Sequence, residues 1–292
     1  MTGAAQTSMA LPLVGLSTTV VGASTDLGRL AETGADVLEL CRCDFERWTR
    51  IARFIRSSST PIGLHCPIPY DGQLTSFEIT GPDQSERRLA LRLVERTLQA
   101  AAESTAAYVV VHFPSPRRAG PWSESRPAAD PDGWARILQD GADLAELQRR
   151  FGVPVFVENL SYHPEFGSAA HYRALFESFP NLRMCLDVGH AHLSRHSTDL
   201  FAFVRDTAGF VGSVHWYDTV RTGPDAGRHD RPPAAVGLEE DRIDLPALLR
   251  TLAAQGRPDY MVLEYAGAVD EFAAARSAVR RLRESVGELS WR

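Results

Sequence analysis

The stretch VPVFVENLSYHPEFGSAAHYRALFESFPNLRMCLD, residues 153–187, indicates the class of fold. It opens with an apolar run at 153–158, continues with a segment of helical length at 169–179, and closes with a second apolar run at 182–187. Short runs that are apolar on both faces are typical of buried parallel strands. The stretch therefore predicts a strand–helix–strand unit with parallel strands.

The same alternation repeats along the whole chain. Apolar runs predict further strands at 13–17, 36–40, 61–65, 108–112, 211–215 and 260–264. Helices are expected at 25–32, 45–57, 84–103, 132–151, 198–207, 245–255 and 268–284. Eight strands alternating with eight helices, without a break in composition, predict a single (β/α)8 TIM barrel over residues 1–292. A doubly wound sheet is the alternative, but no glycine-rich fingerprint opens its first helix.

Composition excludes several classes of function. The chain has 292 residues, of which 44% are hydrophobic and 23% charged, a balance that allows a large buried core. Its net charge of -6 does not favour broad attraction to nucleic acid or to an anionic membrane. All 31 basic residues are arginine, because the sequence contains no lysine. Schiff-base aldolases, pyridoxal enzymes and P-loop nucleotide hydrolases all need a lysine, so these classes are excluded.

The cysteines and the N-terminal segment predict a compartment. Cys41, Cys43, Cys66 and Cys185 are too few for a disulfide scaffold, and we expect reduced thiols. The N-terminal segment lacks the features of a signal peptide, and no apolar run approaches the roughly 20 residues of a membrane span. The sequence predicts a soluble, cytoplasmic protein without a membrane partner. It leaves the oligomeric state open.

Polar residues end six consecutive predicted strands. They are His65, His112, Glu158, Asp187, His215 and Glu264. All six are metal-ligating types, and the carboxyl ends of barrel strands are where barrel enzymes keep their chemistry. Acids and imidazoles that converge on a barrel axis cannot be desolvated together without a compensating cation. The pattern therefore predicts a bound divalent metal ion.

Two further histidines extend this group of candidates. His190 follows Asp187 by three residues in LDVGHAH, which we interpret as a loop reaching over the mouth. His229 lies in the long segment after the strand at 211–215. His192 and His196 are expected to be solvated. No pattern assigns a role to His163 or His171.

Two long irregular segments, 113–131 and 216–244, follow the fourth and seventh predicted strands. Both are rich in proline and glycine and exceed the usual length of such loops, so we expect them to cap the mouth. Arg117 and Trp122 in the first segment, and Tyr70 after the third strand, are candidates for contacts with substrate.

Several of these motifs occur together in a known family. They are GLHCPIPY (63–70), VVVHFP (109–114), VFVEN (155–159), CLDVGHAH (185–192), SVHWYD (213–218) and VLEY (262–265). With them the chain resembles the xylose-isomerase-like, apurinic-endonuclease-type TIM barrels from its first strand to its last. The resemblance implies that one divalent ion, zinc or manganese, is held by Glu158, Asp187, His215 and Glu264.

Family members with two or three zinc ions add ligands that match His65, His112 and His190, so the resemblance implies one to three ions per chain. They also carry a loop motif Asp-x-His. The sequence departs there, because Gly227 stands two residues before His229, with Asp225 and Asp230 nearby. The lysine of the isomerase proper is missing as well, which argues against sugar ring-opening of that kind.

The family divides chiefly into sugar isomerases or epimerases and nucleases that cut DNA at abasic sites. A nuclease must present basic surface to phosphates. Segment 66–83 has no basic residue, and segment 216–244 has four arginines against seven acids. The sequence thus favours a small carbohydrate-like substrate over nucleic acid. A zinc-dependent phosphodiester hydrolase is the alternative, and a catalytically silent metal-stabilised binding protein is a third class.

The mechanism that the sequence favours is proton transfer beside a carbonyl. A bound metal ion would polarise the carbonyl and lower the pKa of the adjacent C–H. Glu158 and Glu264 come from predicted strands on roughly opposite sides of the barrel. By resemblance to the epimerases, one removes the proton and the other returns it. His190 would orient or polarise a substrate hydroxyl.

Overall fold

The computed structural model describes residues 11–22, 26–41, 43–70, 79–115, 132–161, 163, 166–194, 196, 199–221, 242–267 and 271–291. Its parallel strands close into a barrel in chain order, which confirms the predicted (β/α)8 fold. The strands are β1 Leu13–Ser17, β2 Val37–Leu40, β3 Ile62–His65, β4 Tyr108–His112, β5 Val155–Glu158, β6 Arg183–Asp187, β7 Val211–Trp216 and β8 Tyr260–Leu263.

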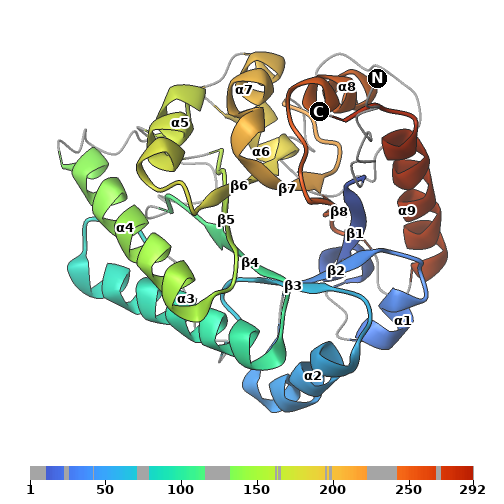
Figure 1. Ribbon diagram of the computed structural model, residues 1–292, viewed down its shortest axis with the longest axis horizontal. Helices are drawn as coiled ribbons and strands as arrows, with labels where there is room; N and C mark the ends of the chain where they lie inside the picture. Colours follow the sequence, from blue (N-terminus) through green and yellow to red (C-terminus); the bar gives the residue numbers. More distant parts are fainter. Residues whose placement is uncertain are drawn as a thin grey trace, which may run out of the picture.

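Helices form a ring around the barrel (Figure 1). They are α1 Leu27–Ala31, α2 Phe45–Ser57, α3 Gln84–Ser104, α4 Gly133–Phe151, α5 Ala169–Ser178, α6 Val188–Leu193, α7 Leu200–Thr207, α8 Leu245–Gln255 and α9 Phe272–Gly287. Two short 3-10 helices, η1 Thr18–Val21 and η2 Ala208–Phe210, adjoin β1 and β7. Most helices begin at an aspartate or serine whose side chain accepts a backbone N–H, as α2 does at Asp44.

Helix α6 corrects the interpretation of LDVGHAH as a loop. The helix begins directly after β6, because the side chain of Asp187 accepts the backbone N–H of His190 and caps the first turn. The capping aspartate is also the last residue of a strand, so the chain turns into the helix at once. His190 is thereby held on a helical turn over the mouth.

The strand residues that precede the polar strand ends form an apolar layer inside the barrel. Val37, Tyr108, Val110, Phe156, Cys185 and Val262 form one buried cluster there. The Tyr108 ring needs the space that Gly63 leaves, since a Cβ at that glycine would lie 2.2 Å from the ring. This layer packs beneath the polar strand ends and makes the barrel a filled core rather than a pore.

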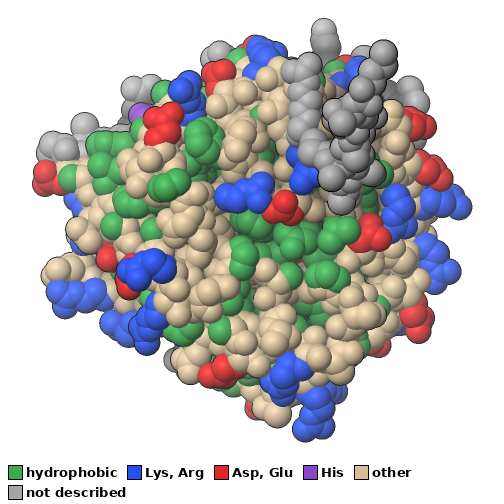
Figure 2. Space-filling model, in the orientation of Figure 1, with side chains coloured by type: hydrophobic (Ala, Val, Ile, Leu, Met, Phe, Trp, Pro, Cys, Tyr) green, Lys and Arg blue, Asp and Glu red, His purple; other side chains and the backbone are tan. Residues whose placement is uncertain are grey.

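The outer surface mixes both signs of charge. On the face shown in Figure 2, arginine and acidic side chains are interspersed, and hydrophobic side chains gather near the middle. Ion pairs such as Arg283 with Asp36 at 2.8 Å link neighbouring elements of the barrel. The four cysteines are free thiols, as predicted. None of the helices in the described ranges combines the length and hydrophobicity of a membrane-spanning helix.

Candidate functional site

Four of the predicted metal ligands lie at the carboxyl ends of the consecutive strands β5 to β8. Glu158 and Asp187 are the last residues of β5 and β6, His215 is the penultimate residue of β7, and Glu264 directly follows β8. All four side chains are buried. In the sheet register Asp187 pairs with His215. The barrel therefore brings together the four residues that the resemblance grouped as ligands of one ion.

Three carboxylates surround one nitrogen of this group. From Nδ1 of His215, the distance to Oε2 of Glu264 is 2.6 Å, to Oε2 of Glu158 3.6 Å and to Oδ2 of Asp187 3.8 Å. One ligand atom from each of the four residues lies within 4.8 Å of the others. Atoms that share a zinc ion, each bonded at about 2.0–2.2 Å, stand apart by distances of this order.

The chemistry of these atoms fits a divalent cation. Oδ2 of Asp187 and Nδ1 of His215 are buried and have no hydrogen-bond partner within the described ranges. The other oxygen of Asp187 is occupied, since it accepts the backbone N–H of His190 at 2.6 Å and the Tyr217 hydroxyl at 2.8 Å. Carboxylates buried this close together repel one another, and a bound cation offsets that cost. The residues present therefore fit a metal ion.

The remaining predicted ligands of the described chain surround Glu158. Nε2 of His65 lies 2.9 Å from its Oε2, and Nε2 of His112 lies 3.2 Å from the same oxygen. Nδ1 of His190 lies 3.2 Å from Oε1 of Glu158 and 2.9 Å from the carbonyl oxygen of Asn159. His65 and His112 thus face one oxygen of Glu158, and His190 faces the other. His65, His112 and Glu158 form a second cluster with metal-binding geometry.

The imidazoles keep both glutamates ionised. Burial raises the pKa of Glu158, but His112 and His215 outweigh burial and hold that pKa well below its ordinary value. Burial acts in the same direction on Glu264, and His215 holds the pKa of this carboxyl at about 2. Both carboxylates are therefore bases in their charged form at neutral pH.

The carboxylates act on the histidines in the opposite sense. Burial lowers the pKa of His65, but its hydrogen bond to Glu158 raises that pKa to about 9. Burial likewise lowers the pKa of His190, whereas Asp187 and Glu158 raise it to about 9. Without an ion, the mouth therefore balances its negative charge with imidazolium groups.

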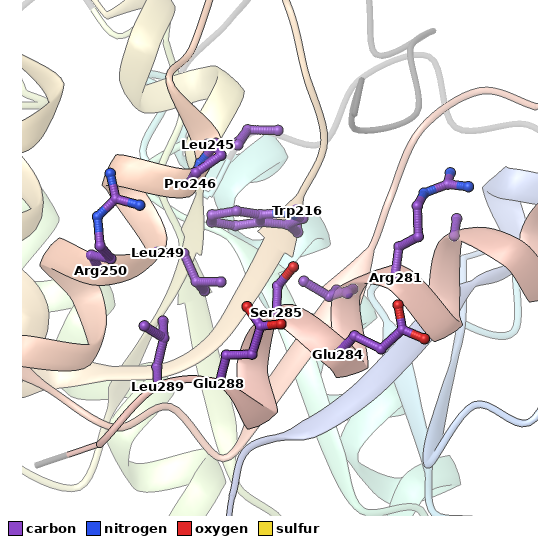
Figure 3. A pocket seen from close by; sticks show the side chains of 12 residues that line it. Trp216, Leu245, Pro246, Leu249, Arg250, Arg281, Glu284, Ser285, Glu288 and Leu289 are labelled. Carbon is purple, nitrogen blue, oxygen red and sulfur yellow. The ribbon is translucent and has the colours of Figure 1, made fainter. Parts of the chain in front are cut away.

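Alternation along β7 separates the site from an outer pocket. His215 points into the barrel, while its neighbour Trp216 points outward into a pocket of about 330 Å³ between α8 and α9 (Figure 3). Leu245 and Leu249 line that pocket beside Trp216. Trp216 is 3% exposed, so its side chain packs β7 against α8 and α9, while its backbone carbonyl accepts the N–H of Glu264 at 3.4 Å.

Three residues that support the candidate ligands were not predicted from the sequence. Glu39, on β2, lies 3.1 Å from Nε2 of His215. Asn159 holds the backbone of Asp187 through two hydrogen bonds, and Tyr217 donates to its side chain. A signal for Glu39 was present, because it is a charged residue inside the apolar run 36–40. Asn159 and Tyr217 each directly follow a strand, but their side chains are uncharged, so nothing in the sequence indicated a role beside a metal site.

The prediction that His192 and His196 are solvated was wrong. His192 is 8% exposed, because α6 packs it into the protein. His196 is half-buried, and its Nε2 lies 2.8 Å from the carbonyl oxygen of His163.

Of the candidates for substrate contacts, Tyr70 alone falls within the described residues. Tyr70 is half-buried, and its backbone N–H donates to the carbonyl oxygen of Cys43 at 3.1 Å. Arg117, Trp122 and His229 lie outside the described residues, as does most of the segments 113–131 and 216–244.

The closed barrel and its mouth of buried carboxylates and imidazoles define a (β/α)8 protein with a candidate divalent-metal site. The chain belongs to the xylose isomerase-like TIM barrel family, whose model matches residues 27–285. Among curated proteins, none matches the sequence significantly.

Solved structures share the fold at low sequence identity. An L-ribulose 3-epimerase is 18% identical, with a TM-score of 0.70, and the match covers 95% of each chain. A 3-keto-D-glucoside 4-epimerase from E. coli is 18% identical, with a TM-score of 0.67 over 94% of this chain and 99% of that one. A Thermus thermophilus protein, soaked with zinc chloride, is 22% identical, with a TM-score of 0.64 over 94% and 98%.

Proposed function

We propose that the protein is a divalent-metal-dependent isomerase or epimerase that transfers a proton next to a carbonyl of a small polyhydroxylated substrate. One observation carries the proposal. Glu158 and Glu264 reach the same nitrogen of His215 from different strands, so two buried and ionised carboxylates flank one point. A pair of bases on two sides of a bound carbon is what inversion or proton shuttling requires.

The ion would be held by Glu158, Asp187, His215 and Glu264. When bound, a divalent metal polarises a carbonyl oxygen and stabilises the negative charge that develops there. The zinc soak of one structural relative and the donor set of mixed carboxylate and imidazole support zinc or manganese. His65 and His112, next to Glu158, would hold a further ion.

The side chains of the chain itself move the proton. Glu158 or Glu264 accepts it from the carbon next to the carbonyl, and the other glutamate returns one. His190, whose imidazolium form is favoured, donates a hydrogen bond to a substrate oxygen and orients the carbon between the two carboxylates. Tyr70, Arg117, Trp122 and His229 remain predicted contacts for the substrate or a further ion.

The similar structures support this class of substrate. An L-ribulose 3-epimerase inverts carbon 3 of a ketose, which adjoins the carbonyl carbon, and a D-psicose 3-epimerase with the same fold was crystallised with D-fructose. We therefore propose a carbohydrate-like substrate, and the predicted cytoplasmic location agrees with a metabolic role.

Solvent exchange tests the proposed reaction. A panel of ketoses, keto-cyclitols and their phosphates would be incubated with metal-loaded protein in heavy water and analysed by mass spectrometry and NMR. We expect deuterium on the carbon next to the carbonyl of the true substrate. Glu158→Gln and Glu264→Gln should each lower exchange by about 10²–10⁴-fold, because glutamine cannot take the proton. Glu146→Gln, an exposed position on α4, is the control. Normal turnover in both mouth variants with metal bound would contradict the assigned roles.

A second candidate function is metal-dependent phosphodiester hydrolysis. It is favoured by the contact of His65 and His112 with one oxygen of Glu158, because these residues could hold a second ion next to the first. Two neighbouring ions can stabilise the attacking and the leaving oxygen in phosphodiester hydrolysis. We expect no strong cleavage of an oligonucleotide that contains an abasic site. Turnover above ~1 per second, abolished by Glu264→Gln, would favour the hydrolase instead.

A further inference from the structure

A buried carboxylate lies at Nε2 of His215, whereas Nδ1 of the same ring faces the candidate metal ligands Glu158, Asp187 and Glu264. Glu39 is the third residue of β2 and is 0% exposed. Its Oε1 lies 3.1 Å from Nε2 of His215, which is on β7. Its side chain therefore crosses the barrel interior from one strand to another that is not its neighbour in the sheet.

The other oxygen of Glu39 is also occupied. Oε2 accepts a hydrogen bond of 2.9 Å from the Tyr108 hydroxyl. The Tyr108 ring can reach this position because position 63 is glycine, where a Cβ would lie 2.2 Å from the ring. Burying a carboxylate is strongly unfavourable unless it is well hydrogen-bonded. The two contacts give each oxygen of the carboxylate a hydrogen-bond donor, and the contact with His215 is independent of the one with Tyr108.

The position of Glu39 decides which nitrogen of His215 carries a proton. A carboxylate only accepts hydrogen bonds, so Nε2 must donate to it. When a metal ion lies among the carboxylates at Nδ1, the ring is neutral and Nδ1 keeps its lone pair for the ion. That nitrogen faces the carboxylates of Glu158, Asp187 and Glu264. The ring is therefore oriented with its acceptor side toward the candidate metal site.

We propose that Glu39 is a positioning residue for metal binding, which fixes the Nε2–H tautomer and the ring plane of His215 so that Nδ1 binds the ion. The inference rests on the metal site of the proposed function. Glu39 contacts neither the substrate nor the ion and acts through His215. A carboxylate behind a ligating histidine raises the basicity of the ring, and its removal typically costs about 10–100-fold in metal affinity.

Two matched variants separate this role from simple packing. Glu39→Gln keeps the shape of the side chain and removes its charge, whereas Tyr108→Phe removes the other hydrogen bond and leaves the carboxylate on His215. Each full-length protein would be stripped with a chelator and titrated with Zn²⁺ in competition with a chromophoric chelator. We expect affinity to fall by about 10–100-fold in Glu39→Gln and to stay close to wild type in Tyr108→Phe.

A spectroscopic measurement on the wild type does not depend on the folding of any variant. In zinc-loaded protein with ¹⁵N-labelled histidine, we expect His215 to bind zinc through Nδ1 and to show a slowly exchanging Nε2 proton at low field. Zinc on Nε2, or equal zinc affinity in wild type and folded Glu39→Gln, would overturn this inference alone. A wild-type protein that binds no divalent ion would overturn it together with the metal site of the proposed function.

Discussion

The mouth of the barrel and the loop after β5 both bury histidines, but the mouth favours the charged form of the ring and the loop favours the neutral form. At the mouth, His65 and His190 are each 8% exposed and face carboxylates, which raise the pKa of both rings to about 9. In the loop, His163 is 6% exposed, and burial together with His196 and His171 lowers its pKa to about 3. Equal burial thus leads to opposite protonation, because the neighbouring groups decide the outcome.

The rings around His163 form an aromatic cluster, which consists of Trp134, His163, Phe166, His171 and Tyr172. Phe166 lies at its centre, with ring centroids at 4.8 Å from Tyr172, 5.2 Å from His171, 5.8 Å from Trp134 and 5.9 Å from His163. The mouth brings charged side chains together, whereas the aromatic cluster packs rings against one another. Changes at the mouth should therefore alter metal binding and activity, and changes in the cluster should alter stability.

The largest expected effect is on the aromatic cluster. Phe166→Ala should lower the free energy of unfolding by about 3–5 kcal/mol, because the ring is 1% exposed and its loss leaves a cavity among four neighbours. Urea denaturation would measure the change. The zinc affinity of the folded variant should match wild type, since the cluster supplies none of the candidate ligands. A folded variant that has lost zinc binding would contradict the view that the aromatic cluster and the metal site are independent.

The next effect is on metal binding at the mouth. Asp187→Asn can still cap α6 through an oxygen but loses the unpartnered Oδ2, so affinity for divalent metal should fall by about 100-fold, roughly 2.7 kcal/mol. Asp199→Asn, the same change at the N-cap of α7, is the matched control. Elemental analysis and zinc titration would test both variants. Near-zero metal in the wild type and in Asp187→Asn alike would contradict the site.

The fold and most candidate ligands were predictable because both depend on local pattern. An apolar run followed by a helical segment needs no knowledge of the rest of the chain, and a barrel brings the strand ends together wherever they lie in the sequence. Glu158, Asp187, His215 and Glu264 were found in this way. The strand-end pattern also pointed to His65 and His112, which the structure brings beside Glu158.

The remaining features depend on partners that are distant in sequence. Glu39 acts on His215 from 176 positions away, and nothing in the run 36–40 indicates which strand it faces. His192 was expected in solvent because a strand end that caps its own helix cannot be distinguished from a loop by composition. The pKa of His163 could not be inferred either, since it depends on burial and on the rings of His196 and His171.

The smallest effect concerns the pH dependence of stability and sharpens the comparison of the two histidine environments. Nδ1 of His163 accepts the backbone N–H of Phe166 at 2.9 Å, so the folded state needs this ring unprotonated. In the unfolded chain its pKa returns to the ordinary value of 6.5, against about 3 in the folded state. Between these values the unfolded state binds more protons, and stability falls as pH falls.

The expected loss can be isolated by substitution. His163→Asn keeps an acceptor near the position of Nδ1 but does not titrate. From pH 7.5 to pH 6.0 the wild type should lose about 0.8 kcal/mol more unfolding free energy than this variant. Both proteins would be unfolded in urea with a chelator present, so that proton-linked metal loss is absent and the titration of His65 and His190 cancels in the difference. Parallel pH profiles would mean that the pKa of His163 is the same in the folded and the unfolded protein. A wild type that gains stability toward pH 6.0 relative to His163→Asn would reverse the sign, and this histidine would then resemble those at the mouth.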